Sequence, residues 1–236
     1  MPETPYPQLV LDILPSADPT FSNFVVGNNE AAVAALQKLE PGRAVYLWGP
    51  EGCGKSHLLQ AAVHARPGAV LCGPATAHAD FERLQHEPLP PMIGIDDVQL
   101  LDARQQAIVF GLYNQWRESA ATRQATILVV TGDRAPLHMP LREDLRTRLG
   151  WDLVFRLELL SDHDKLAALQ AHASSKSLKI APEILDWLLT HYVRDMRQLT
   201  TLIDALDRYS LATKRPITLP LLKTMLAEAS ASTRIR

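Results

Sequence analysis

The chain has 236 residues, of which 47% are hydrophobic, a fraction typical of a globular fold with one large or two small domains. Its 24 Lys and Arg residues stand against 26 Asp and Glu residues, and the net charge of −2 disfavours tight DNA binding through phosphate neutralisation. Two cysteines provide no disulfide framework, no apolar run approaches the ~20 residues of a membrane span, and the N-terminus lacks a signal-peptide pattern, so we expect a soluble cytoplasmic protein.

Residues 1–20 contain five prolines, so we expect an extended arm without regular structure. Within this arm an apolar peptide has no fold of its own to bury its side chains, which favours docking in a groove of another protein. The alternative is that the arm packs on its own domain. The residues that matter in this peptide are Gln8, Leu9, Leu11 and Ile13.

From residue 21 to about residue 157, helical and strand patterns alternate. Apolar runs that predict strands buried on both faces of a parallel sheet occupy residues 44–48, 69–72, 92–95 and 126–131, and a fifth strand is indicated at 154–157. A helix predicted over residues 102–119 places Ile108, Leu112 and Trp116 on one stripe. Strands separated by such helices indicate an α/β fold with a doubly wound parallel sheet.

The strongest motif is a phosphate loop, GPEGCGKS at residues 49–56, which fits G-x-x-x-x-G-K-[ST] between a predicted strand and a predicted helix. Its glycines let backbone N–H groups surround a pyrophosphate, and the helix adds the positive end of its dipole. We expect Lys55 to reach the phosphates of ADP or ATP and Ser56 to hold Mg²⁺. The alternative is a glycine-rich turn that binds nothing. The predicted nucleotide ligands are Gly49, Pro50, Glu51, Gly52, Cys53, Gly54, Lys55, Ser56 and His57.

Two acids follow the predicted strand at residues 92–95. Asp96 is expected in the second shell of the Mg²⁺ ion, and Asp97 is expected to orient an attacking water. Two aspartates after a strand are often only a turn or a helix cap. Their place about 40 residues beyond the phosphate loop favours the catalytic interpretation.

Further polar residues follow the run at 126–131. Asp133 is placed to touch the γ-phosphate or to position water, although a plain turn explains it equally well. Arg142, Arg146 and Arg148 lie beside acidic residues, which is more typical of a solvated helical face with ion pairs. The functional alternative is that one of them enters a neighbouring subunit's nucleotide site as an arginine finger.

After residue 160 the strands give way to four helical patterns, which indicates a small all-α domain. A capping box at Ser161 opens the first helix, Pro182 opens the second, the third starts near Asp195, and Thr218 caps the fourth. Arg197, in the third helix, reads by itself as a surface residue. The expected parts are an arm at 1–20, an α/β domain at 21–157 and a helical domain at 158–236.

The phosphate loop, the paired acids, the element at 131–134 and the four-helix lid together resemble the AAA+ P-loop NTPases. Within that superfamily, the chain resembles the DnaA family of bacterial replication initiators over nearly all of residues 20–230. The initiators continue past the lid into a helix-turn-helix domain, whereas this chain stops at Arg236, so we expect no direct DNA-binding domain. The segments that carry the resemblance are residues 20–28, 95–100, 148–151 and 194–199.

With its N-terminal peptide, this architecture resembles the Hda family, which inactivates DnaA. The resemblance implies that the peptide binds the sliding clamp, the β subunit of DNA polymerase III. The resemblance also implies that the clamp-bound protein would promote ATP hydrolysis by DnaA and prevent re-initiation. By position, Gln8, Leu9, Leu11 and Ile13 would enter the clamp's groove.

The same resemblance assigns roles around the nucleotide. Arg148 would be the arginine finger that acts in trans on ATP held by DnaA, and Arg197 would be the lid arginine that senses the bound nucleotide. The segment that packs near the adenine would be Phe24, Val25 and Val26.

The chain departs from the superfamily pattern at the second acid. Asp97 stands where typical AAA+ motors have Glu, and its side chain is one methylene shorter, which favours slow hydrolysis. Lys55 is retained where some Hda-like loops have Arg, so nucleotide binding should be conventional. Because the ADP form is the competent one in this family, we expect the nucleotide to act as a structural switch.

Two other functions remain open at this point. A helicase-loader type AAA+ protein would carry basic loops that face single-stranded DNA, which a net charge of −2 does not favour. A small-molecule P-loop kinase would have its lid inserted within the sheet domain, whereas here the helices follow the sheet. The sequence also leaves the oligomeric state open between a homodimer and a monomer.

Overall fold

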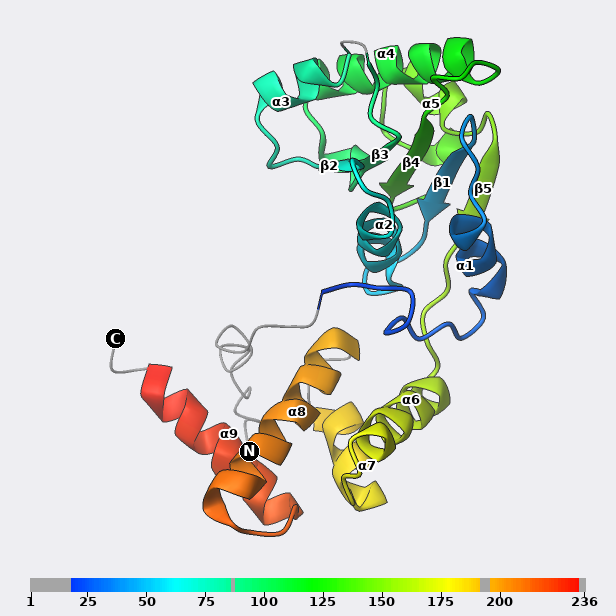
Figure 1. Ribbon diagram of the computed structural model, residues 1–236. Helices are drawn as coiled ribbons and strands as arrows, with labels where there is room; N and C mark the ends of the chain where they lie inside the picture. Colours follow the sequence, from blue (N-terminus) through cyan, green and yellow to red (C-terminus); the bar gives the residue numbers. More distant parts are fainter. Residues whose placement is uncertain (1–17, 86–87, 192–195, 234–236) are drawn as a thin grey trace. The chain divides into compact units, whose positions relative to one another are not determined.

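The structure is a computed structural model that describes residues 18–85, 88–191 and 196–233 (Figure 1). The described chain divides into two compact units, one over residues 19–159 and one from residue 160 onward. Each unit has its own buried apolar clusters. Among the described helices, none combines the length and the apolar character needed to cross a bilayer.

The first unit alternates helices and strands along the chain. Its strands are β1 (Ala44–Trp48), β2 (Val70–Cys72), β3 (Met92–Ile95), β4 (Ile127–Gly132) and β5 (Leu153–Arg156). Its α-helices are α1 (Glu30–Gln37), α2 (Lys55–His64), α3 (His78–Arg83), α4 (Ala103–Ser119) and α5 (Glu143–Arg148). Two short 3-10 helices are η2 (Val98–Leu100) and η3 (Pro136–His138).

The five described strands run parallel in one sheet, in the order β2-β3-β4-β1-β5. The register pairs Trp48 with Gly132, so β1 and β4 end at the same level, and Ile95 of β3 pairs with Val130 nearby. Loops that leave the carboxyl ends of parallel strands meet at one edge of the sheet. The phosphate loop and both acidic turns therefore come together there.

The strand predictions are confirmed in the middle of the sheet and differ at its edges. β1 and β3 span the predicted residues, β4 lies one residue further along the chain than predicted, and β5 lies one residue earlier. The prediction that residues 69–72 are buried on both faces is wrong, because Leu71 of β2 is 37% exposed. β2 is an edge strand, and a strand with a neighbour on one side only is covered less completely.

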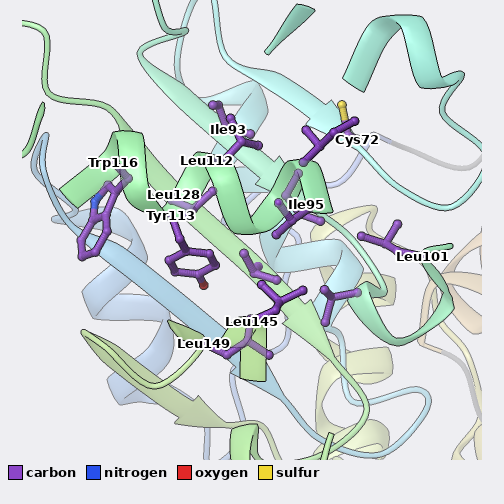
Figure 2. Close-up of a cluster of buried hydrophobic side chains, with 14 of the residues drawn as sticks. Cys72, Ile93, Ile95, Leu101, Leu112, Tyr113, Trp116, Leu128, Leu145 and Leu149 are labelled. Atoms are coloured by element: carbon purple, nitrogen blue, oxygen red, sulfur yellow. The ribbon is translucent and has the colours of Figure 1, made fainter. Parts of the chain in front are cut away.

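Alternate strand residues point to opposite faces of the sheet and build two cores. Tyr46 and Leu128 belong to the core that includes α3, α4 and α5, whereas Val45 and Val129 belong to the core with α1 and α2. Figure 2 shows the first core, in which Leu112, Tyr113 and Trp116 project from α4 toward the strands. The predicted stripe on this helix is confirmed, since its residues Ile108, Leu112 and Trp116 are buried.

The second unit is built from four described helices, as the sequence predicts. Ser161 and Asp164 form the predicted capping box at the start of the first, and the Thr218 hydroxyl accepts a hydrogen bond from the backbone N–H of Leu221 in the last. Their apolar faces share one core around Leu188 and Leu202. The helices are α6 (Asp162–Ser175), α7 (Pro182–His191), α8 (Met196–Thr213) and α9 (Leu219–Thr233).

Candidate nucleotide-binding site

The phosphate loop links the end of β1 to the start of α2. Gly52 and Gly54 adopt left-handed backbone conformations, with φ of 78° and 92°, which favour glycine at both positions. Gly54 is the residue before the first turn of α2, and no side chain in the described part of the chain caps that turn. The N–H groups at the start of this 10-residue helix are therefore left for an anion.

Close packing around the loop leaves no room for larger residues. A Cβ atom at Gly49 would meet the carbonyl oxygen of Leu157 at 2.4 Å, and one at Gly54 would meet the Phe24 ring at 2.6 Å. Pro50, Glu51 and Gly52 are exposed, whereas Cys53 is buried. The backbone itself thus lines the cradle, as phosphate binding requires.

The Lys55 side chain lies inside this loop. It is only 8% exposed, and its Nζ donates hydrogen bonds to the carbonyl oxygens of Gly49 and Pro50, at 2.8 Å and 2.9 Å. Burial raises the pKa of the neighbouring Cys53 thiol, which keeps that group neutral at pH 7. The ammonium is the single buried charge within the loop, and a phosphate is a stronger partner for it than a carbonyl.

Ser56 and Asp96 meet at the metal end of the site. The Ser56 hydroxyl lies 3.1 Å from Asp96 Oδ1, and the Thr131 hydroxyl donates to the same oxygen at 2.6 Å. Hydroxyl and carboxylate oxygens are the hard ligands that Mg²⁺ prefers, and Mg²⁺ usually takes one or two protein groups plus phosphates and water. These donors fit a nucleotide-bound Mg²⁺ ion.

Asp97 takes a backbone conformation that is uncommon for residues other than glycine, although Asp and Asn adopt it more often than most. Its φ and ψ are 48° and 54°, in the left-handed region. Its N–H donates to Thr131 Oγ1 at 2.9 Å, and its carboxylate accepts from Gln99 Nε2 at 2.9 Å. The second acid is therefore held at both its backbone and its side chain.

Asp133 follows β4 at the same edge. Arg134 donates to both of its carboxylate oxygens, which lowers the pKa of Asp133, and the charge of Lys55 lowers it further. The carbonyl of Arg134 accepts a hydrogen bond from the Tyr46 hydroxyl at 2.8 Å. The electrostatic coupling to Lys55 places Asp133 with the phosphate loop, ionised and already paired.

The segment before α1 packs against the start of α2. The Phe24 ring lies 5.3 Å from the His57 ring, between their centroids, and Val25 and Val26 are half-buried beside it. His57 Nε2 lies 2.9 Å from the carbonyl oxygen of Thr20. Phe24 therefore lies against the phosphate loop and the start of α2.

Comparisons with known proteins fit this architecture. The family model described as "Hda, lid domain" matches residues 162–226, which cover α6 to α8 and part of α9. Residues 162–226 are therefore similar to the lid domain of the Hda family.

Solved structures share the fold of this chain. Domain III of the Thermotoga maritima replication initiation protein DnaA is 23% identical with a TM-score of 0.70, over 91% of this chain and 98% of that one. AMPPCP-bound DnaA from Aquifex aeolicus is 20% identical with a TM-score of 0.63, over 80% and 65%. A point mutant of Thermotoga maritima RuvB is 16% identical with a TM-score of 0.64, over 90% and 73%.

The three predicted arginines of the α5 region differ in their surroundings. Arg142 forms an ion pair with Asp144 at 2.7 Å, as expected for a solvated face, and Arg146 lines a hollow of about 420 Å³ beside η3. Arg148 instead lies over the Phe110 ring at 3.8 Å. Arg142 lies over the same ring at 5.7 Å, but of the three only the Arg148 guanidinium donates hydrogen bonds to neutral acceptors in the described part of the chain.

Arg148 is fixed on its own unit by two residues of α4 and two of its own segment. Its Nε and Nη2 atoms donate to Asn114 Oδ1 at 3.1 Å and 2.9 Å, and Nη1 donates to the carbonyl oxygen of Asp144 at 3.0 Å. Trp151 lies 4.8 Å from the guanidinium on another side. Sequence reasoning singled out Arg148 but not its neighbours Phe110 and Asn114, which lie on the partly exposed side of α4 and carry no motif of their own.

Thr131 was recognised in the sequence only as part of the element at 131–134, and Tyr46 and Gln99, two further residues at the site, were not singled out as functional. The first two lie in predicted strands, where their hydroxyl groups gave no signal, because strand patterns read only alternation and apolar character. Gln99 lies two residues beyond Asp97, and the sequence alone does not show which way its amide points.

Several predicted residues cannot be placed at the site. Arg197 lies near the start of α8, on the second unit, and its side chain is exposed. The clamp peptide with Gln8, Leu9, Leu11 and Ile13 lies outside the described residues. Residues 194 and 195 of the lid motif also lie outside them.

Proposed function

We propose that this chain binds ADP or ATP with Mg²⁺ at the carboxyl edge of its sheet and uses the nucleotide as a switch. The observation that carries this proposal is the convergence of a buried Lys55, an uncapped α2 and the Ser56–Asp96 pair on one loop. The backbone N–H groups and Lys55 would hold the phosphates. AMPPCP-bound DnaA, which shares the fold, supports the proposal.

Ser56 and Asp96 would hold the metal on the side of the phosphates. Mg²⁺ supplies charge neutralisation and orientation of the phosphate oxygens when bound. Asp97 would orient water, but Gln99 holds its carboxylate at 2.9 Å, and the side chain is shorter than a glutamate. Slow intrinsic turnover follows from both features.

We propose further that the chain regulates replication initiation by acting on DnaA. The peptide with Gln8, Leu9, Leu11 and Ile13 would dock on the polymerase sliding clamp. Clamp-bound protein would then stimulate ATP hydrolysis by DnaA and prevent re-initiation. The match of residues 162–226 to the lid of the Hda family supports this role.

Arg148 would supply the positive charge that stabilises the transition state on the ATP held by DnaA. Its guanidinium already makes three hydrogen bonds within its own unit. Entering a partner's site would therefore require it to exchange Asn114 and the Asp144 carbonyl for phosphate oxygens. The exchange is favourable because hydrogen bonds between two charged groups are stronger than those to neutral oxygens.

Arg197 would report on the nucleotide from the lid. Its side chain is exposed at the start of α8, and its carbonyl oxygen accepts from the hydroxyls of Thr200 and Thr201. The backbone there is thus fixed while the guanidinium projects into solvent. A long cationic side chain on a firm helix suits contact with a phosphate.

Two measurements test the proposal. Calorimetry with ADP and with ATP should show uptake, and its absence would refute the nucleotide site. Pull-down on purified sliding clamp should capture the wild-type chain and lose it with Leu11→Ala combined with Ile13→Ala. Val10→Ala is the matched control, since Val10 lies in the same peptide but outside the Gln-Leu-x-Leu-x-Ile pattern. Equal capture of all three proteins would remove the support for clamp docking.

A further inference from the structure

Thr131 is a fully buried polar side chain at the end of β4, with 0% exposure. It lies two residues before Asp133, in the strand between β3, which leads to the two acids, and β1, which leads to the phosphate loop. Buried hydroxyl groups need partners, because an unsatisfied one costs free energy. The hydrogen-bond partners of the Thr131 hydroxyl are the two acids of the site, Asp96 and Asp97.

The Thr131 hydroxyl uses both of its hydrogen-bonding capacities on these acids. Its proton is donated to Asp96 Oδ1 at 2.6 Å, and its lone pair accepts the N–H of Asp97 at 2.9 Å. A hydroxyl has one proton to donate, so the two roles are assigned without ambiguity. One oxygen atom thus connects the metal-side carboxylate to the backbone of the water-side acid.

From this geometry we propose that Thr131 is a positioning residue that sets the orientation of Asp96 and Asp97 for the Mg²⁺-nucleotide complex. The inference rests on the proposed nucleotide site. Ser56 also contacts Asp96 Oδ1, but its hydroxyl is the group expected to serve the metal. Thr131 is fully buried, so its hydroxyl can keep the hydrogen bond to Asp96 while the Ser56 hydroxyl binds the metal.

The same hydroxyl supports the unusual backbone of Asp97. A residue with φ of 48° and a side chain persists only where its surroundings fix it. The N–H of Asp97 points at Thr131, while the Asp97 carbonyl accepts from Leu100 N at 2.9 Å. Without the hydroxyl the turn would lose one of its two backbone anchors.

The end of β4 is held firmly enough to position other groups. A Cβ atom at Gly132 would lie 2.1 Å from the Tyr46 hydroxyl oxygen, so only glycine allows the side chain of Tyr46, from β1, to pack against the backbone here. Tyr46 then donates to the carbonyl of Arg134 at 2.8 Å. The segment from Thr131 to Arg134 is thus fixed to both neighbouring strands, which is what a precise supporting residue needs.

The test is Thr131→Val, which keeps the shape and removes the hydroxyl. A fluorescent ADP analogue is titrated with increasing Mg²⁺ and again in EDTA. We expect the Mg²⁺ concentration needed for half-maximal binding to rise about 10–100-fold, as for other residues that orient metal ligands. Affinity in EDTA should stay at the wild-type value, because the hydroxyl does not touch the phosphate loop.

Thr126→Val is the matched control. Thr126 is 2% exposed on the residue before β4, and its hydroxyl donates to the carbonyl of Pro90 at 2.6 Å, at the opposite end of the strand from the acids. Removing it costs a comparable buried hydrogen bond but should leave the Mg²⁺ dependence unchanged. Thr131→Ser retains the hydroxyl and should keep the wild-type response even if Thr131→Val does not fold.

Each outcome decides the inference. Equal Mg²⁺ dependence of Thr131→Val and wild type, equal loss in Mg²⁺ and EDTA, or loss of the response in Thr131→Ser would overturn it while leaving the nucleotide site intact. No uptake of nucleotide by the wild-type chain would overturn the proposed function, and the inference with it.

Discussion

Replacing Arg148 with alanine tests whether this residue only stabilises its own fold or also acts on the ATP held by DnaA. The substitution removes three hydrogen bonds and two ring contacts, at 3.8 Å and 4.8 Å. Because the guanidinium is half-exposed, we expect a cost of only about 1–2 kcal/mol in the free energy of unfolding. That corresponds to a fall in melting temperature of roughly 2–8 °C.

The expected functional loss is far larger. An arginine finger contributes about 10³–10⁵ in rate, whereas a protein stable by about 5–15 kcal/mol stays almost entirely folded after losing 1–2 kcal/mol. Arg148→Ala should therefore abolish stimulated ATP hydrolysis by DnaA while its own affinity for ADP stays near the wild-type value. Instability cannot account for a loss of that size.

The assay follows conversion of DnaA-bound ATP to ADP in the presence of clamp loaded on DNA. Arg142→Ala is the control, because Arg142 lies beside the same helix and its ion pair with Asp144 is exposed. That variant should retain stimulation. The reasoning fails if Arg148→Ala still stimulates DnaA, or if it loses its own nucleotide affinity, which would place Arg148 in the chain's own site.

Two further predictions concern the first unit. Gly54→Ala should abolish ADP uptake in calorimetry, because the added Cβ would meet the Phe24 ring at 2.6 Å. Gly68→Ala is the control: with φ of 80° and contacts of 3.5 Å, it should lower the free energy of unfolding by about 1–2 kcal/mol and leave ADP binding unchanged. ADP uptake by both variants would contradict this prediction. The Arg43 guanidinium donates hydrogen bonds to Asp152 and holds the pKa of that carboxyl below its ordinary value. The pair therefore stabilises the fold above about pH 4, and this contribution is lost as the pH falls through the lowered pKa. Asp152→Asn should cost about 1 kcal/mol in urea unfolding at pH 7 and clearly less at pH 3, and an equal cost at both values would refute the linkage.

Much of the fold was readable from local sequence. The apolar runs of β1 and β3, the stripe on α4 and the capping box at Ser161 each depend on residues close together in the chain. The phosphate loop is local in the same sense, because its glycines, lysine and serine occupy eight consecutive positions. Patterns of this kind fix conformation through neighbours that are always present.

The supporting residues of the site were decided by tertiary structure. Thr131 meets Asp96 across 35 positions, Arg148 meets Asn114 across 34, and the Tyr46 hydroxyl meets Arg134 across 88. Sheet order also decided the partial exposure of β2, since its apolar run resembles those of the central strands. A hydroxyl or amide acquires its role from whichever strand or helix is packed beside it, and that neighbour is chosen by the whole chain.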